Sequence, residues 1–374
     1  MSSAVRPPFR RRRWGAIALV TSLVVLVLAL AARALPGARA RSLPTGAAQW
    51  IWKDIDWDDH QPAVFYMLRD FDLATPPAAA RLLVTADEEY VLTLNGRRIG
   101  IGAFQPGAIV DVYEAGPFLR PGANRLMIEV RSARGAGGLL AGLVDGAGRM
   151  LVGTDGRWRL FLTYELGLER GWLPLGRGVP VYCWGYPPMG RWGRPRLGPL
   201  KPGLGEVAGS PVPAISAIPQ PPVLPAPAGR PPGSPVLYDW GREVTGYVSL
   251  ELAPTASAAE LAEMQKALLF TGDSPPDPLR SSPASSILIA PGRRGWLDAR
   301  PRRFRYALIL GLVPSATLAV LPVPPTPDIA AAPLPARGER GVLGIVPPPL
   351  RTPVEDEVWG KLQRFAGVAG RKEL

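Results

Sequence analysis

Residues 81–99 read RLLVTADEEYVLTLNGRRI, and this stretch decides the fold. Two apolar runs within it, 81–86 and 90–94, are short and contain the β-branched and aromatic residues that favour strands. Asn95-Gly96 follows the second run and is a dipeptide that accepts the positive φ angles of a two-residue hairpin turn. The stretch therefore predicts short antiparallel strands joined by tight turns.

The same pattern extends on both sides of this stretch. Pro121-Gly122 marks another turn, and residues 124–130 alternate again between apolar and polar. The large aromatic side chains predicted for the hydrophobic core are those of Trp50, Trp52, Phe65, Phe71 and Trp158. No stretch of helical periodicity interrupts residues 48–165, so we predict an antiparallel β-sandwich there.

Proline and glycine set the next boundary. Residues 166–235 are rich in both, and the prolines between Pro199 and Pro235 lack the N–H donors that a ladder or a helix needs. We therefore predict an extended, semi-rigid linker over 166–235. The functional alternative for this segment is a polyproline ligand that docks in the aromatic groove of another protein.

A second β domain is predicted over residues 236–322. Residues 236–240 and 247–252 alternate between apolar and polar, as strands with one buried face do. Residues 258–270 fit either a short helix or a strand. With the first sandwich, this domain makes the predicted fold class all-β.

The C-terminal part is predicted as a proline-rich linker over 323–351 and a short amphipathic helix with its tail over 352–374. The helix begins at Thr352-Pro353-Val354-Glu355, which has the form of a capping box with proline at the first helical position. Apolar side chains then share one face at Val354, Val358, Leu362 and Phe365. Because a single short helix is marginal in water, we expect this face to pack on another surface.

The N-terminus carries a membrane signal. Residues 1–13 form a basic segment, and residues 14–32 contain no charge. Such a run spans roughly 28 Å as a helix, close to the thickness of a bilayer. We predict a transmembrane helix over 14–32 with a cytoplasmic N-terminus, followed by a linker over 33–47 and an extracytoplasmic remainder. The alternative is a cleaved signal peptide, with residues 38–40 (ARA) as the cleavage motif and a secreted product.

The formal net charge of +12 does not indicate a nucleic-acid-binding protein. Eight arginines and no acidic residue lie in the first 47 residues, so most of the positive excess is outside the predicted domains. The chain has one cysteine and one histidine, which excludes an internal disulfide and any histidine-based catalytic triad.

Several segments together resemble one enzyme family. Residues 48–52 (AQWIW), 65–71 (FYMLRDF) and 86–96 (ADEEYVLTLNG) are similar to the N-terminal lectin-like sandwich of bacterial α-L-rhamnosidases. Residues 238–247 (YDWGREVTGY) and 303–306 (RFRY) are similar to the first and last motifs of the next sandwich in that family. The resemblance implies two antiparallel β-sandwich domains of the jelly-roll, galactose-binding-like type, placed after the predicted transmembrane helix.

The resemblance implies sugar binding without catalysis. In that family the catalytic carboxylates lie on an (α/α)₆ barrel that follows the two sandwiches, and glycoside hydrolysis needs two carboxylates that flank the sugar bond. The sequence given ends at Leu374, near the point where the first connecting helix would begin. We therefore expect a membrane-anchored, carbohydrate-binding accessory protein with no catalytic residue, and a rhamnose-containing glycan as its ligand.

Three residues are predicted to contact the sugar: Asp87 and Glu88 at the start of one strand and Asn124 at the start of another. In related lectin-like domains, loops of this kind offer carboxylate and amide oxygens to sugar hydroxyls, sometimes through calcium. The alternative is that Asp87 and Asn124 cap turns through local hydrogen bonds. No metal ligands are assigned, and calcium is the one cofactor considered.

Two other functions remain open. The chain is the N-terminal half of a split glycosidase if a separate catalytic subunit docks on the predicted C-terminal helix. It is a structural scaffold of the cell envelope if both β domains act only as spacers. Carbohydrate, membrane and a separate catalytic subunit are thus the expected partners, and nucleic acid is not.

Overall fold

The computed structural model describes residues 19–28, 30, 43–56, 61–204, 211–220, 235–253, 267–311 and 316–323. All of them belong to one compact unit, residues 1–331. The predicted C-terminal helix, 352–374, lies outside the described residues, as does nearly all of the predicted linker before it. We call the described residues of 43–204 the first module and those of 211–323 the second module.

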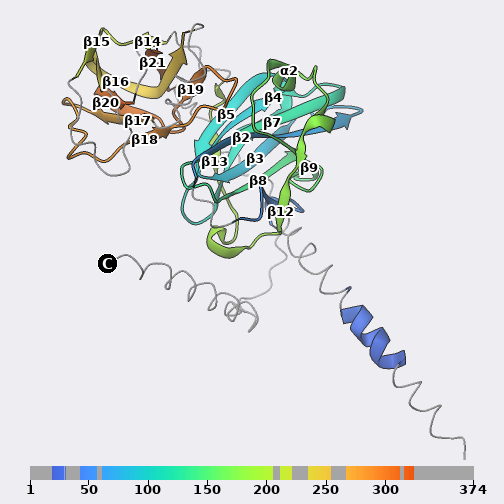
Figure 1. Cartoon of the computed structure of the whole chain (residues 1–374). Helices are drawn as coiled ribbons and strands as arrows, with labels where there is room; N and C mark the ends of the chain where they lie inside the picture. The colour runs from blue at the N-terminus through green and yellow to red at the C-terminus, as the bar shows by residue number, and fades with distance from the viewer. Residues whose placement is uncertain are drawn as a thin grey trace, which may run out of the picture. The chain divides into compact units, whose positions relative to one another are not determined.

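The first module contains two β-sheets that pack face to face (Figure 1). The first sheet has the order β12 (Tyr182–Gly185), β1 (Trp50–Trp52), β8 (Gly138–Asp145), β3 (Ala80–Asp87), β6 (Ile109–Glu114) and β13 (Arg196–Lys201), with β9 (Met150–Gly153) beside β8. The second sheet has the order β11 (Val179–Pro180), β10 (Arg159–Phe161), β2 (Ala63–Leu73), β7 (Gly122–Ser132), β4 (Glu89–Leu94) and β5 (Arg97–Ala103). All strand pairs of this module are antiparallel except β6 with β13, so the predicted all-β fold class is confirmed.

Aromatic side chains from both sheets fill the space between them. Trp52 of β1 meets Phe65 of β2 edge to face, with ring centroids 5.0 Å apart. Trp158 is fully buried in the same cluster, and its Nε1 donates a hydrogen bond to the carbonyl oxygen of Gly153 at 3.0 Å. These residues are among those that the alternating sequence pattern predicts for the core.

Within residues 81–99 the turn forms as predicted, but the two apolar runs do not pair with each other. Asn95 and Gly96 have φ angles of 52° and 77°, and they connect β4 to β5 as a two-residue hairpin. The two apolar runs, however, lie in different sheets: β3 ends at Asp87 in the first sheet, and β4 begins at Glu89 in the second. The chain therefore crosses from one sheet to the other at residues 87–89.

The predicted linker is partly built into the sheets. The described residues of 166–219 contribute α2 (Leu166–Arg170), two short 3₁₀ segments, and the strands β11, β12, β13, β14 (Val212–Pro213) and β15 (Ser216–Pro219). The 3₁₀ segments of the module are Gly116–Phe118, Leu175–Arg177 and Gly190–Trp192. The prediction that this proline-rich region cannot form a ladder is wrong here, because an edge strand needs hydrogen bonds on one side only.

The second module is one continuous eight-stranded sheet in the described residues. Its order is β14, β21 (Ala316–Pro322), β16 (Val236–Leu252), β20 (Arg302–Leu310), β17 (Ala267–Gly272) and β18 (Ser285–Ile287), and both β15 and β19 (Gly295–Leu297) pair with β16. The sheet has its own core, in which Trp240 meets Phe304 edge to face at 5.1 Å. Residues 267–270, at the end of the ambiguous segment 258–270, are a strand. The strands that the structure describes in this region thus form one sheet, and not the two sheets of the predicted sandwich.

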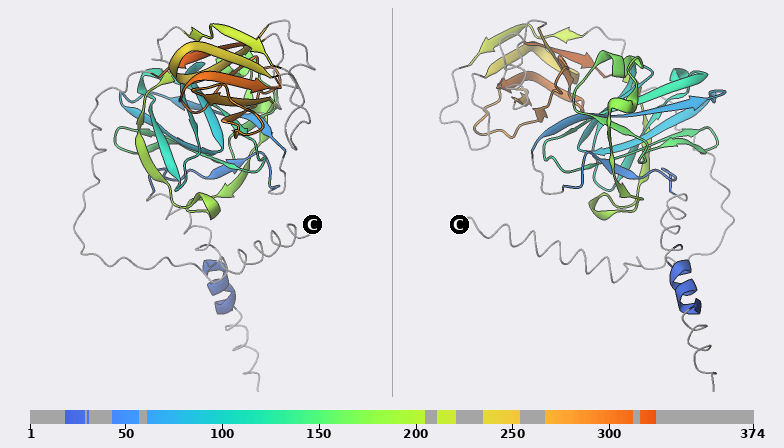
Figure 2. Two further views of the ribbon diagram at one scale, coloured as in Figure 1. Left: turned by 90° about the vertical axis from the view of Figure 1, so that its left-hand side faces the viewer. Right: turned by 45° about the vertical axis from the view of Figure 1, so that its right-hand side comes forward.

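Residues 19–28 and 30 are helical and lie within the predicted span 14–32 (Figure 2). Among the described residues, no helix has both the length and the apolar character needed to cross a bilayer. The remaining residues of the predicted span lie outside the described ones.

Candidate functional site

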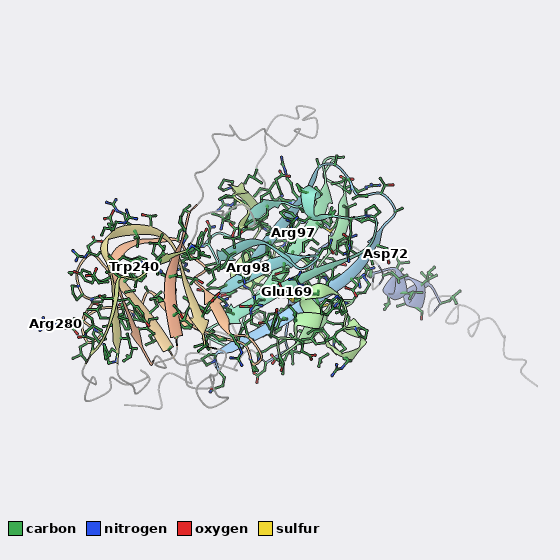
Figure 3. The ribbon with its side chains drawn as sticks, turned by 90° about the horizontal axis from the view of Figure 1, so that it is seen from above. Asp72, Arg97, Arg98, Glu169, Trp240 and Arg280 are labelled. Atoms are coloured by element: carbon green, nitrogen blue, oxygen red, sulfur yellow. The ribbon has the colours of Figure 1, made fainter. Side chains whose placement is uncertain are left out.

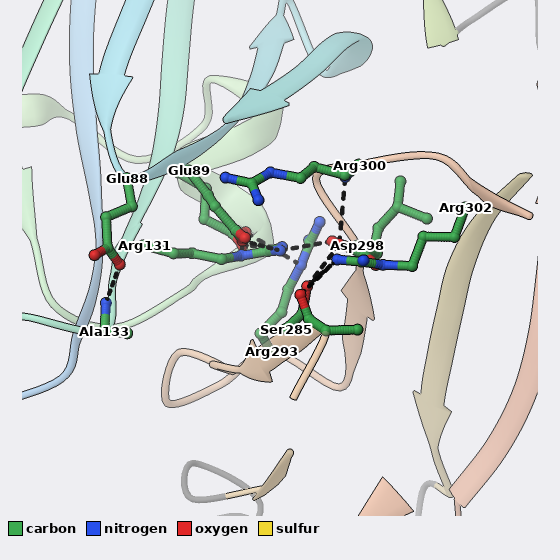
Figure 4. A network of polar contacts seen from close by, with 12 residues as sticks. Glu88, Glu89, Arg131, Ala133, Ser285, Arg293, Asp298, Arg300 and Arg302 are labelled. Carbon is green, nitrogen blue, oxygen red and sulfur yellow. Dashed lines mark hydrogen bonds and ion pairs between the residues drawn. The ribbon is translucent and has the colours of Figure 1, made fainter. Parts of the chain in front are cut away.

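The crossing at residues 87–89 forms one side of a cavity of about 790 Å³. The first module lines it with residues 87–89, with 104–106 after β5, and with residues 131, 133 and 134 around the end of β7. The second module lines it with residues 283–286, 288 and 300. The volume lies within the range of small-molecule sites, about 300–1,000 Å³. Figure 4 shows the polar side chains at this place.

Glu88 is fixed at the cavity wall by two donors. Its Oε2 accepts a hydrogen bond from the backbone N–H of Ala133 at 2.7 Å (Figure 4), and its Oε1 lies 2.7 Å from Nε of Arg134. The Arg134 side chain is 74% exposed, whereas that of Glu88 is 21% exposed. Glu88 is therefore a charged, oriented carboxylate whose ion pair remains accessible to water.

The side chain of Asp87 accepts a hydrogen bond from a buried tryptophan. Nε1 of Trp192 donates a hydrogen bond to Oδ2 of Asp87 at 3.2 Å, and the Trp192 ring stacks on Trp50 with centroids 4.3 Å apart. Gly137 lies against the same backbone, because a Cβ atom there would be 2.2 Å from the carbonyl oxygen of Asp87. The orientation of Asp87 thus depends on residues from the region that the sequence marks as linker.

Glu89 points to the same cavity from the first residue of β4. Burial raises the pKa of its carboxyl to about 7, although the Arg131 guanidinium opposes this shift. The nearest atoms of Glu89 and Arg131 in this pair are Oε2 and Nη1, which are 3.8 Å apart. Glu89 therefore changes its charge near neutral pH.

Gln105 adds an amide to the cavity wall. Its Nε2 donates a hydrogen bond to Oδ1 of Asp111 at 3.0 Å, and Asp111 is buried. The carboxylate of Asp111 is held in turn by Lys201, whose Nζ lies 2.7 Å from Oδ2, and by the hydroxyl of Tyr90. This buried network fixes the orientation of the Gln105 side chain.

Arg131 joins the two modules beside the cavity. Its Nη2 lies 2.6 Å from Oε1 of Glu129, and its Nη1 donates a hydrogen bond to the carbonyl oxygen of Leu297 at 2.6 Å. The guanidinium also lies over the ring of Trp296, 5.7 Å from its centroid. Apolar contacts of β4 and β5 with the segment around Leu297 accompany these bonds.

Glu129 is the buried anion of this junction. Burial by itself raises the pKa of Glu129, but the guanidinium groups of Arg131 and Arg293 outweigh it, so the pKa lies below its usual value. Arg293 of the second module also pairs with Glu169, with 3.2 Å between Nη1 and Oε2. Figure 3 shows Glu169 near Arg98, a further cation that lowers the pKa of Glu129.

Asn124 lies near the start of β7, where its side chain bonds to the preceding turn and does not reach the cavity. Its Nδ2 donates hydrogen bonds to the carbonyl oxygens of Arg120 and Gly122 at 2.8 and 2.9 Å. Its Oδ1 accepts hydrogen bonds from the backbone N–H of Arg120 and from Nδ2 of Asn95. Asn124 is buried and is not among the residues that line the cavity. The structure thus brings together Asp87 and Glu88 but not Asn124, whose contact with a sugar stays a prediction.

Metal ligation is not evident in the described part of the chain. No group of three or more His, Cys, Asp or Glu side chains there could hold a metal ion. The carboxylates of Asp87 and Glu88 accept hydrogen bonds from Trp192 and Ala133. A calcium ion at this site stays a prediction from the sequence.

No protein-family model matches the chain, and no curated protein matches it. Among solved structures, the α-L-rhamnosidase from Dictyoglumus thermophilum shares 15% identity, with 73% of this chain and 35% of that chain covered and a TM-score of 0.44. The α-L-rhamnosidase from Aspergillus terreus shares 16% identity, with 74% and 36% covered and a TM-score of 0.44. A lectin from Pleurotus ostreatus in complex with GalNAc shares 15% identity, with 73% and 76% covered and a TM-score of 0.35.

These likenesses concern the fold alone. The chain spans about a third of the length of the rhamnosidases it matches. The strands and sheets of the described residues by themselves agree with the all-β prediction, and the activity of any of these proteins is a matter of proposal for this chain.

Proposed function

We propose that this protein binds carbohydrate in the cavity beside Asp87 and Glu88 and does not cleave it. The observation that carries the proposal is the mixture of groups around one cavity of small-molecule size. Sugar hydroxyls both donate and accept hydrogen bonds, so a site for them needs acceptors and donors in one place. Carboxylates, guanidinium groups, the amide of Gln105 and the hydroxyls of Ser285 and Ser286 meet this need, and Phe104 adds an apolar surface.

Preorganisation supports this proposal. Asp87, Glu88 and Gln105 each have a hydrogen-bonded partner behind them, namely Trp192, Ala133 and Asp111. A ligand therefore pays little entropy to order these side chains, which favours affinity. The accessory role rests on the sequence resemblance, in which the catalytic carboxylates belong to a separate barrel.

Glycan-array screening with rhamnose-containing oligosaccharides, followed by calorimetric titration of the full chain with and without calcium, tests the proposal. Glu88→Gln is expected to weaken binding about tenfold or more, because it removes a charge-assisted hydrogen bond. Asp72→Asn is the matched control: Asp72 is exposed near the end of β2 and does not line the cavity (Figure 3). Absence of binding to every glycan, or release of rhamnose from an aryl glycoside that stops when one carboxylate is neutralised, would contradict the proposal.

The same titration tests Asn124. A loss of affinity in Asn124→Ala at unchanged stability would support its predicted contact with the sugar. A loss of stability alone would indicate that its only role is the turn.

Export is part of the proposal and rests on the sequence pattern of residues 10–32. The proposed location is outside the cytoplasm, with the N-terminus inside. Protease added to intact cells is expected to degrade the β modules, whereas complete protection of the modules in intact cells would contradict export.

A further inference from the structure

Arg300 differs from the other arginines that line the cavity. Arg131 lies 2.6 Å from Glu129, and Arg134 lies 2.7 Å from Glu88. The backbone N–H of Arg300 donates a weak hydrogen bond to Oδ1 of Asp298 at 3.3 Å. Its guanidinium group has no ion pair or hydrogen bond with any residue that the structure describes.

Asp298, the acidic residue of the second module that lies near Arg300, already has ionic and hydrogen-bonded partners. Asp298 is fully buried, pairs with Nε of Arg302, and accepts a hydrogen bond from Oγ of Ser285 at 3.0 Å. Arg302 also donates to the carbonyl oxygen of Ala284 at 2.7 Å. The Arg300 side chain extends away from Asp298, toward the side of the cavity formed by Glu88 and Glu89 (Figure 4).

We propose that the cavity selects sugars that carry a carboxylate, and that Arg300 binds this carboxylate. The inference rests on the proposed carbohydrate binding and names its ligand class, a uronic-acid residue. A guanidinium group presents parallel N–H donors that match a carboxylate in a bidentate pair, and it stays charged at all physiological pH values. A neutral sugar would leave Glu89 as the counter-charge of this cation in the occupied, less hydrated cavity, and Glu89 loses its charge at lower pH.

Glu89 makes this selectivity dependent on pH. The groups that act on it are Arg131 from β7, Asp298 and Arg300 from the segment after β19, and its neighbour Glu88. With a pKa of about 7, Glu89 is an anion beside the ligand at higher pH and a neutral group at lower pH. An anionic ligand is therefore expected to bind more tightly at about pH 6 than at about pH 8, while its own carboxyl group stays ionised.

Titration of the full chain with the methyl glycosides of glucuronic and galacturonic acid, and with their methyl esters, tests the proposal. The acid is expected to bind about tenfold or more tightly than its ester, because the ester cannot form the charged pair. Arg300→Gln is expected to remove this difference, because the acid loses much more affinity than the ester. Arg280→Gln is the matched control, because Arg280 is an exposed arginine that pairs with Asp277 and does not line the cavity (Figure 3).

Glu89→Gln isolates the pH effect. This variant is expected to bind the acid with nearly the same affinity at both pH values, and a persistent change with pH would contradict the role of Glu89.

The remaining outcomes separate the two proposals. If the ester or a neutral oligosaccharide binds as tightly as the acid, acid selection is wrong and carbohydrate binding stands. If a sulfated sugar binds and the uronate does not, the assignment of a carboxylate is wrong. If no sugar binds at all, the proposed function fails and this inference fails with it.

Discussion

Arg131→Met is expected to lower the free energy of unfolding by about 3–5 kcal/mol, because it leaves a buried carboxylate without its main partner. The side chains of Arg131 and Glu129 are only 3% and 6% exposed. Methionine keeps the apolar stem but lacks the guanidinium group, so the loss comprises the charge pairing, the bond to Leu297 and the cation–π contact with Trp296. The next cation, Arg293, is 3.9 Å from Glu129 and replaces this pairing only in part.

Urea unfolding of the full chain, followed by tryptophan fluorescence, measures this loss. The matched control is Arg149→Met, which breaks the ion pair with Asp145 at 3.0 Å on the surface of the first module. Because the Arg149 side chain is 78% exposed, water compensates most of that loss, and a much smaller change is expected. Equal effects of the two substitutions would show that the Arg131 pair does not stabilise the junction.

Trp192→Ala is expected to lower the free energy of unfolding by about 3–5 kcal/mol and to weaken sugar binding. The residue is almost fully buried, stacks on Trp50 and donates its indole N–H to Asp87. Its removal opens a space behind the cavity and leaves Asp87 without the donor that orients it. Stability and affinity are therefore expected to fall together.

A milder substitution separates these two effects. Trp192→Phe keeps an aromatic ring against Trp50 but lacks the N–H, so affinity is expected to fall more than stability. Trp240→Phe is the control: Trp240 is also buried and donates its N–H to the carbonyl oxygen of Val212 in the second module, but it does not line the cavity. Parent-like affinity in Trp192→Phe would mean that the orientation of Asp87 is unimportant for the ligand.

Local signals in the sequence were sufficient for the hairpin and for the first sandwich. The dipeptide Asn95-Gly96 forms the predicted turn, and the aromatic side chains predicted for the core, such as Trp52 and Phe65, are buried between the two sheets. The order of the strands is not local. Residues 81–86 and 90–94 are neighbours along the chain, yet they belong to different sheets because each pairs with strands from elsewhere.

The region predicted as linker shows the same limit. Its prolines correctly exclude a central strand, but they do not exclude an edge. β13 pairs with β6, and β15 pairs with β16, both through partners distant in sequence. No pattern within the region itself indicates these partners.

The candidate site was predicted in part. Asp87 and Glu88 stand out because acidic residues directly follow an apolar strand. Glu89 belongs to the same run but was not singled out, since its burial depends on the second module. Arg131 and Arg300 could not be assigned to the cavity, because nothing in the sequence places the second module beside β4.

Each of the three sheets ends on one side with a proline-containing strand: β13 with Pro199, β11 with Pro180 and β14 with Pro213. A proline removes one N–H from the outermost row of backbone groups, where another chain would otherwise add its own strand. The proline-rich composition that makes this sequence look unstructured thus also hinders strand addition at the sheet edges of the described residues, and so hinders aggregation.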